Sequence, residues 1–133
     1  MTQLAAIIAA LLFGAVAALQ VALALGAPLG GYVLGGRHAG TLPPRLRLLS
    51  GIAALILGVS ALIVLAQAGI ITSWAVPEGL LAPVTWVVAV FMVLNTLGNV
   101  ASRNKFERYV FGGATAACAV LTAFVALTGS GSG

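Results

Sequence analysis

The sequence has very few charged side chains. Of its 133 residues, six are Lys or Arg and two are Asp or Glu, so only 6% are charged, whereas 62% are hydrophobic. Average soluble domains carry about 25% charged residues, and disordered segments combine low hydrophobicity with high net charge. The composition therefore excludes a soluble domain and a disordered chain, and it predicts a single-domain integral membrane protein.

Side chains for acid–base and metal chemistry are equally scarce. The chain has one cysteine, Cys118, one histidine, His38, and two acids, Glu78 and Glu107. A disulfide needs a second cysteine, a metal site needs clustered ligands, and most catalytic mechanisms need several titratable groups. We therefore expect no metal, no cofactor and no catalytic residue, and we expect Cys118 to pack as a small hydrophobic residue.

Four apolar stretches without charges are long enough to cross a bilayer, which takes about 20 residues. They cover residues 4–25, 48–68, 81–100 and 110–127. The short connections between the later stretches favour antiparallel neighbours. The predicted fold is an all-α, integral membrane, up-down-up-down four-helix bundle over residues 1–128. A flexible Gly/Ser tail or engineered linker is predicted at residues 129–133.

All basic residues fall in the first and third connections. The first contains Arg37, Arg45 and Arg47, and the third contains Arg103, Lys105 and Arg108. Because cytoplasmic loops are enriched in Lys and Arg, we predict a multi-pass protein of the inner (plasma) membrane. Segments 27–47 and 101–109 are then cytoplasmic and both termini lie outside. No basic helix face points to nucleic acid.

Small residues recur at every fourth position of the first stretch. The row comprises Ala6, Ala10, Gly14, Ala18, Ala22 and Gly26. Small residues let helix backbones approach closely in a bilayer. The row predicts a homo-oligomer or contact with a larger membrane protein partner, although an alanine-rich composition alone would also produce it.

Polar residues interrupt the predicted third helix. Asn95 and Asn99 lie one turn apart, with Arg103 one turn further on. An amide facing lipid would remain unpaired, so we expect this face to point inward. It either lines a path for a ligand or water, or it forms hydrogen bonds between helices. Gln20 and Gln67 raise the same question, or they reach back to the membrane surface.

The first connection is unusually rich in glycine and proline, with six Gly and three Pro between residues 26 and 44. Its apolar residues predict that it folds back onto the membrane face, and its glycines and arginines could bind an anionic lipid headgroup. The alternative is a turn at the membrane interface whose charges only determine the topology of the chain. Glu107 could bridge to this segment. The candidate binding residues are Arg37, His38, Arg45, Arg47, Asn95, Asn99 and Arg103.

Several segments resemble a set of small four-helix membrane proteins of actinobacteria and bacilli. They are residues 24–32, 35–36, 42–47, 94–99 and 107–109. The resemblance implies the same fold and supplies no catalytic assignment, because no activity is established for the set. The chain also has the size and helix number of small multidrug resistance transporters, but no acid lies inside a predicted span, which argues against their proton coupling through an embedded glutamate.

Three functions remain open. A module that binds or transports a ligand or membrane lipid should place the asparagines and the first connection around one cavity. An accessory or assembly subunit should have them packed shut. A lipid-modifying enzyme, the least favoured, requires His38 to face a pocket with Glu107 or an arginine nearby.

Overall fold

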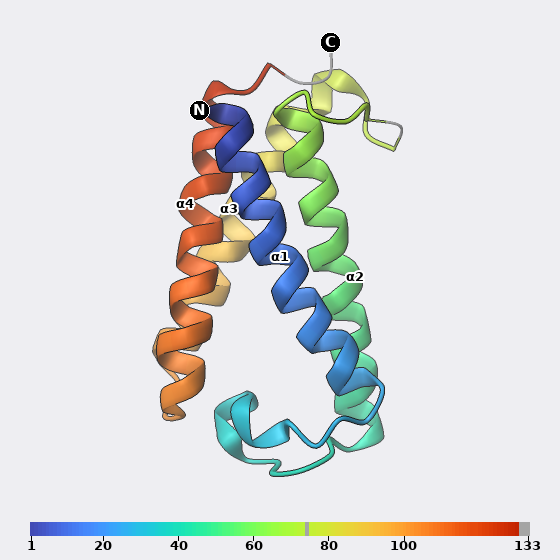
Figure 1. Ribbon diagram of the computed structural model, residues 1–133, viewed down its shortest axis with the longest axis vertical. Helices are drawn as coiled ribbons and strands as arrows, with labels where there is room; N and C mark the ends of the chain where they lie inside the picture. Colours follow the sequence, from blue (N-terminus) through green and yellow to red (C-terminus); the bar gives the residue numbers. More distant parts are fainter. Residues whose placement is uncertain (74, 131–133) are drawn as a thin grey trace.

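The computed structural model describes residues 1–73 and 75–130, which contain four long helices and no strand. The helices are α1 (Thr2–Ala24), α2 (Pro44–Gln67), α3 (Glu78–Val100) and α4 (Gly112–Thr128). All four helical segments are long and apolar enough to cross a membrane. The predicted all-α membrane bundle is thus confirmed (Figure 1).

All four helical segments begin earlier than the hydrophobic stretches indicated, and two of them show why. Pro44 occupies the first turn of α2, where the N–H that proline lacks would have had no partner in the helix. A π-helical turn, η3 (Glu107–Phe111), leads directly into α4. As a result Glu107 stands at the start of a helical segment rather than in an isolated loop.

The helices pack as two pairs, α1 with α2 and α3 with α4, whereas α2 and α3 make few contacts. In Figure 1, α1 runs obliquely from α4 near the N-terminus to α2 at the opposite end. Near the N-terminus, the small residues Ala5, Ala6 and Ala9 are buried in the main core together with Phe13 and Cys118. The packing of Cys118 agrees with its expected role as a small hydrophobic residue. Because α1 leaves α4 along its length, the two pairs separate at the far end.

The segment between α1 and α2, called loop 1 (residues 25–43), folds back across the separated end of the bundle. Val33 and Leu42 are buried beside Leu23 of α1. The Gly30 N–H donates to the Gly40 carbonyl at 2.8 Å and closes the loop on itself. Gly30 is required there, because a Cβ would overlap the His38 carbonyl oxygen. Loop 1 is therefore an ordered cover with its own small apolar core.

At the opposite end, Gln67 does not reach out to the membrane surface. Its side chain is buried, and its Nε2 donates to the Gly129 carbonyl at 2.9 Å. The Thr2 and Thr128 hydroxyls also meet at 2.7 Å, joining the start of α1 to the end of α4. The surface interpretation of Gln67 was wrong, and the carbonyl that it bonds belongs to the first residue of the predicted tail. The rest of the predicted tail, residues 131–133, lies outside the described residues.

Candidate functional site

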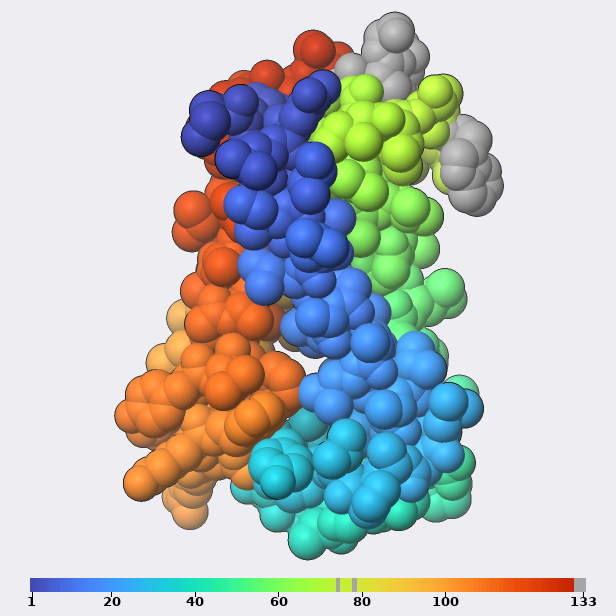
Figure 2. Space-filling view, in the orientation of Figure 1, coloured from blue at the N-terminus to red at the C-terminus, as the bar shows by residue number. Residues whose placement is uncertain are grey.

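A cavity of about 580 Å³, called the inner cavity, lies among all four helices at the loop 1 end of the bundle. Its lining includes Val16, Gln20 and Leu23 of α1, Ser50, Ala53 and Leu57 of α2, Met92, Asn95 and Asn99 of α3, and Glu107, Phe111 and Thr115. Figure 2 shows the molecule hollowed between α1 and α4 just above loop 1. Such a volume is typical of small-molecule sites.

The inner cavity follows from the way the helices diverge. Since α2 and α3 make few contacts, side chains of both helices line the cavity and still reach the outer surface. Leu49 of α2 and Leu94 and Gly98 of α3 are such residues. On this side the cavity is lined by two helices whose outer faces are apolar, so an entry between them would face the hydrocarbon of a membrane.

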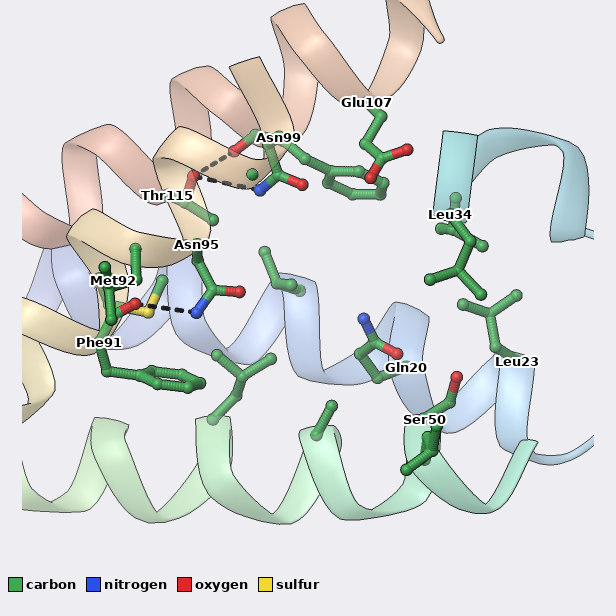
Figure 3. Close-up of a pocket in the computed structure, with 18 of the residues that line it drawn as sticks. Gln20, Leu23, Leu34, Ser50, Phe91, Met92, Asn95, Asn99, Glu107 and Thr115 are labelled. Carbon is green, nitrogen blue, oxygen red and sulfur yellow. Dashed lines mark hydrogen bonds between the residues drawn. The ribbon is translucent and has the colours of Figure 1, made fainter. Parts of the chain in front are cut away.

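Both asparagines of the predicted polar stripe line the inner cavity, as an inward-facing stripe requires (Figure 3). The Asn95 Nδ2 donates to the Phe91 carbonyl of its own helix at 2.9 Å. The Asn99 Nδ2 lies 3.4 Å from the Thr115 hydroxyl of α4. Asn99 therefore links two helices, whereas Asn95 leaves its amide oxygen and one N–H without a partner in the described chain.

Two further polar side chains in the cavity lining lack a hydrogen-bond partner among residues 1–73 and 75–130, whereas the fully enclosed atom without a partner, the Thr122 hydroxyl oxygen, lies outside the cavity. Gln20 reaches the cavity from α1, opposite Asn95, and Ser50 lines it from α2 (Figure 3). Ser50 is only 7% exposed. The Gln20 side chain is half-buried and the polar atoms of both residues are not fully enclosed, so both groups stay open to water or a polar ligand inside the cavity. Sequence reasoning had overlooked Ser50, because a lone serine in an apolar helix gives no distinctive signal.

A second cavity of about 500 Å³, called the mouth cavity, adjoins the inner one at the loop 1 end. It brings together three of the predicted binding residues, Arg37, His38 and Arg103, with Glu107. Neither arginine forms an ion pair with a described side chain. The arrangement also meets the requirement stated for an enzyme, namely His38 in a pocket beside Glu107 and an arginine.

The other two predicted binding residues lie elsewhere. The Arg47 Nε donates to the Ala24 carbonyl at 3.0 Å, so this side chain satisfies a free carbonyl at the end of α1. Arg45 is exposed and lines neither cavity. Both residues lie in the first turn of α2, and neither lines the mouth cavity.

Glu107 is the group that holds loop 1 in place. Its Oε2 accepts the Gly35 N–H at 2.8 Å and the Ser102 hydroxyl at 3.0 Å. Loop 1 exposes this N–H through the left-handed turn at Leu34, Gly35 and Gly36. The expected bridge from Glu107 to the first connection is therefore present. The glycine backbone that could have bound a headgroup instead binds the chain's own carboxylate.

Two neighbouring contacts reinforce this attachment. The segment between α3 and η3, called loop 3 (residues 101–106), supplies Asn104, whose Nδ2 donates to the Gly31 carbonyl at 2.6 Å. Gly36 lies so close that a Cβ would come within 2.9 Å of the Asn104 amide. The rings of Tyr32 and Phe106 meet edge to face, 4.9 Å between centroids. Loop 1 is thus fastened to loop 3 as a cover over both cavities.

Comparisons with protein-family models, curated proteins and solved structures find no match to this chain. Function must therefore be inferred from the two cavities. Among the described residues, no three His, Cys, Asp or Glu side chains lie close enough together to hold a metal ion. What the cavities do offer is apolar surface, hydrogen-bonding groups and positive charge.

Proposed function

We propose that this protein is a small membrane module that binds an apolar or amphipathic molecule in the inner cavity, either to hold it or to transport it. Loops 1 and 3 would lie on the cytoplasmic side of the plasma membrane, in keeping with the six basic residues within these loops and in the helical turns that follow them. The observation that carries the proposal is the inner cavity itself, about 580 Å³ of space bounded by all four helices.

The same observation favours a binding module over an accessory subunit. A protein that only docks a partner gains nothing from an open space of this size among its helices, and it would be more stable with the cavity filled. An entry between α2 and α3 would suit a ligand that arrives from the bilayer, because the ligand need not pass through water.

Filling the cavity tests the proposal. Gly98 lines both cavities, and nothing lies within 4 Å of where its Cβ would be, so Gly98→Leu should fold and occupy the ligand's space. Gly113→Leu is the matched control, because Gly113 is also helical, also has open space at its Cβ and lines neither cavity. Both variants gain the same helix propensity.

The measurement is photolabelling in phosphatidylcholine nanodiscs with a neutral fatty alcohol that carries a diazirine on its chain. Labelled peptides should map to the inner cavity. We expect Gly98→Leu to lower this labelling about tenfold, equivalent to about 1.4 kcal/mol of binding free energy, and Gly113→Leu to leave it unchanged. Equal labelling of the cavity residues in all three proteins would contradict the proposal.

A lipid-modifying enzyme is the second candidate, favoured by the presence of His38, Arg37 and Glu107 in the mouth cavity. An enzyme of this kind should convert a fluorescent phospholipid to a product that thin-layer chromatography resolves, and His38→Gln should abolish the conversion. If the purified protein gives no product from such lipids, only the binding module remains.

A further inference from the structure

The inner and mouth cavities share walls. Leu34 of loop 1, Leu46 of α2, Gly98 of α3 and Glu107 line both of them. The two spaces are therefore neighbours along the bundle axis, one among the helices and the other at the loop end. A single elongated molecule entering between α2 and α3 can occupy both.

The two cavities differ in chemistry. Around the inner cavity, apolar side chains such as Leu57, Phe91 and Met92 surround the few polar groups. Around the mouth cavity, the charged and polar side chains of Arg37, His38 and Arg103 come together. An apolar interior that ends in a polar mouth matches the shape of an amphiphile, with its chain inside and its headgroup at the mouth.

The mouth carries excess positive charge. Two arginines face one carboxylate, that of Glu107, whose Oε2 is already bound to the Gly35 N–H and the Ser102 hydroxyl. Among the described side chains, Arg37 and Arg103 have no anionic partner. The planar guanidinium group binds phosphate and carboxylate oxygens through two parallel hydrogen bonds. An anionic headgroup would therefore supply the negative charge that the two arginines of the mouth cavity lack.

We propose that the two cavities form one site for an amphiphile with an anionic headgroup, a phosphate or a carboxylate. Arg37 and Arg103 bind the headgroup, and the apolar chain enters the inner cavity between α2 and α3. The proposal rests on the proposed function, since it names the class of molecule that the inner cavity binds. Arg45 and Arg47, which lie outside the mouth, take no part.

The test compares two pairs of substitutions that change net charge equally. Arg37→Gln with Arg103→Gln removes both mouth arginines. Arg45→Gln with Lys105→Gln removes one exposed cation from loop 3 and one from the start of α2, and neither of these residues lines a cavity. All four side chains lack hydrogen bonds and ion pairs with the described chain, so neither double variant should disturb folding.

Each protein is photolabelled in phosphatidylcholine nanodiscs with three probes that share one diazirine-tagged chain. The probes are an alkyl phosphate, a fatty acid and a zwitterionic alkylphosphocholine. Each basic residue near an anionic group contributes about 1 kcal/mol, so removing both arginines should lower labelling by an anionic probe about thirtyfold. Labelling by the zwitterionic probe should not change, and the control pair should behave as the unaltered protein.

The phosphate and carboxylate probes separate the two possible headgroups, because the true one should lose most labelling in the mouth variant. Unchanged anionic labelling in the mouth variant overturns the inference, and so does an equal loss in the control pair or an equal loss of all three probes. If Gly98→Leu still lowers labelling by the fatty alcohol, binding in the inner cavity stands and only the anionic headgroup is refuted. If Gly98→Leu has no effect either, both proposals fail.

Discussion

Removing the Asn104 side chain should release loop 1 without unfolding the bundle. In the structure, the Asn104 Nδ2 donates to the Gly31 carbonyl at 2.6 Å, and its Oδ1 accepts the Glu107 N–H at 3.2 Å. A typical hydrogen bond contributes about 1 kcal/mol net, and only the bond to Gly31 joins Asn104 to loop 1, so Asn104→Ala should lower the free energy of opening loop 1 by about 1 kcal/mol. At 1.4 kcal/mol per factor of ten, opening becomes about fivefold more frequent.

Hydrogen exchange followed by mass spectrometry measures this opening directly. Peptides that cover residues 29–38 should exchange about fivefold faster in Asn104→Ala, since the Gly35 N–H is bonded to the Glu107 carboxylate only while loop 1 is closed. Peptides from the middle of α1 and α4 should not change, because the main core of the bundle does not include loop 1.

Lys105→Ala is the matched control, since Lys105 is the next residue, is exposed and has no described partner. It should leave exchange in loop 1 unchanged. If Asn104→Ala exchanges at the same rate as the unaltered protein, the side chain does not hold the loop. If the whole chain exchanges faster instead, loop 1 does not open independently of the helix bundle, and the prediction is refuted.

Two further predictions concern the membrane and self-association. On intact cells, a membrane-impermeant maleimide should label the Ala75→Cys variant and not the Ala39→Cys variant; both alanines are exposed. The buried Cys118 should stay unlabelled in both variants. Labelling of Ala39→Cys alone would show that the predicted orientation is inverted. Gly14 is exposed on α1, and a Cβ added there would meet nothing within 4 Å. Gly14→Leu should therefore hold the helices of two copies apart and weaken a homodimer about tenfold. Light scattering on a sizing column measures this dimer. Leu11→Ile should not weaken it, and identical elution of both variants would assign the row of small residues to composition alone.

The sequence predicted the helices well because a bilayer imposes a strong local requirement. Each spanning segment must satisfy its backbone hydrogen bonds internally and present apolar side chains for about 20 residues. Such segments are recognisable from composition alone, and the structure has four of them where the sequence predicts four. The errors fell at the ends, where the limits of an apolar run do not mark the limits of a helix. Pro44 and Glu107, which begin helical segments, show this.

The inward direction of Asn95 and Asn99 was also predictable, since it follows from the cost of an unpaired amide in lipid. The hydrogen-bond partners of individual polar side chains were not predictable. Gln67 and Gln20 both lie near the ends of their helices. The Gln67 side chain donates a hydrogen bond to the Gly129 carbonyl just after α4, whereas Gln20 lines the inner cavity. Which outcome occurs depends on the partner each meets, and partners come from distant parts of the sequence.

The sequence by itself determined that the chain is a four-helix membrane bundle, with its basic residues in two connections and a polar stripe on one helix. Only the tertiary structure decided which arginines lie together: Arg37 and Arg103 line one cavity, whereas the Arg47 side chain bonds the carbonyl at the end of α1. The physical reason is the oblique path of α1. It separates α2 from α3 at one end, opens the inner cavity there, and leaves loop 1 to close the gap by binding Glu107 and Asn104.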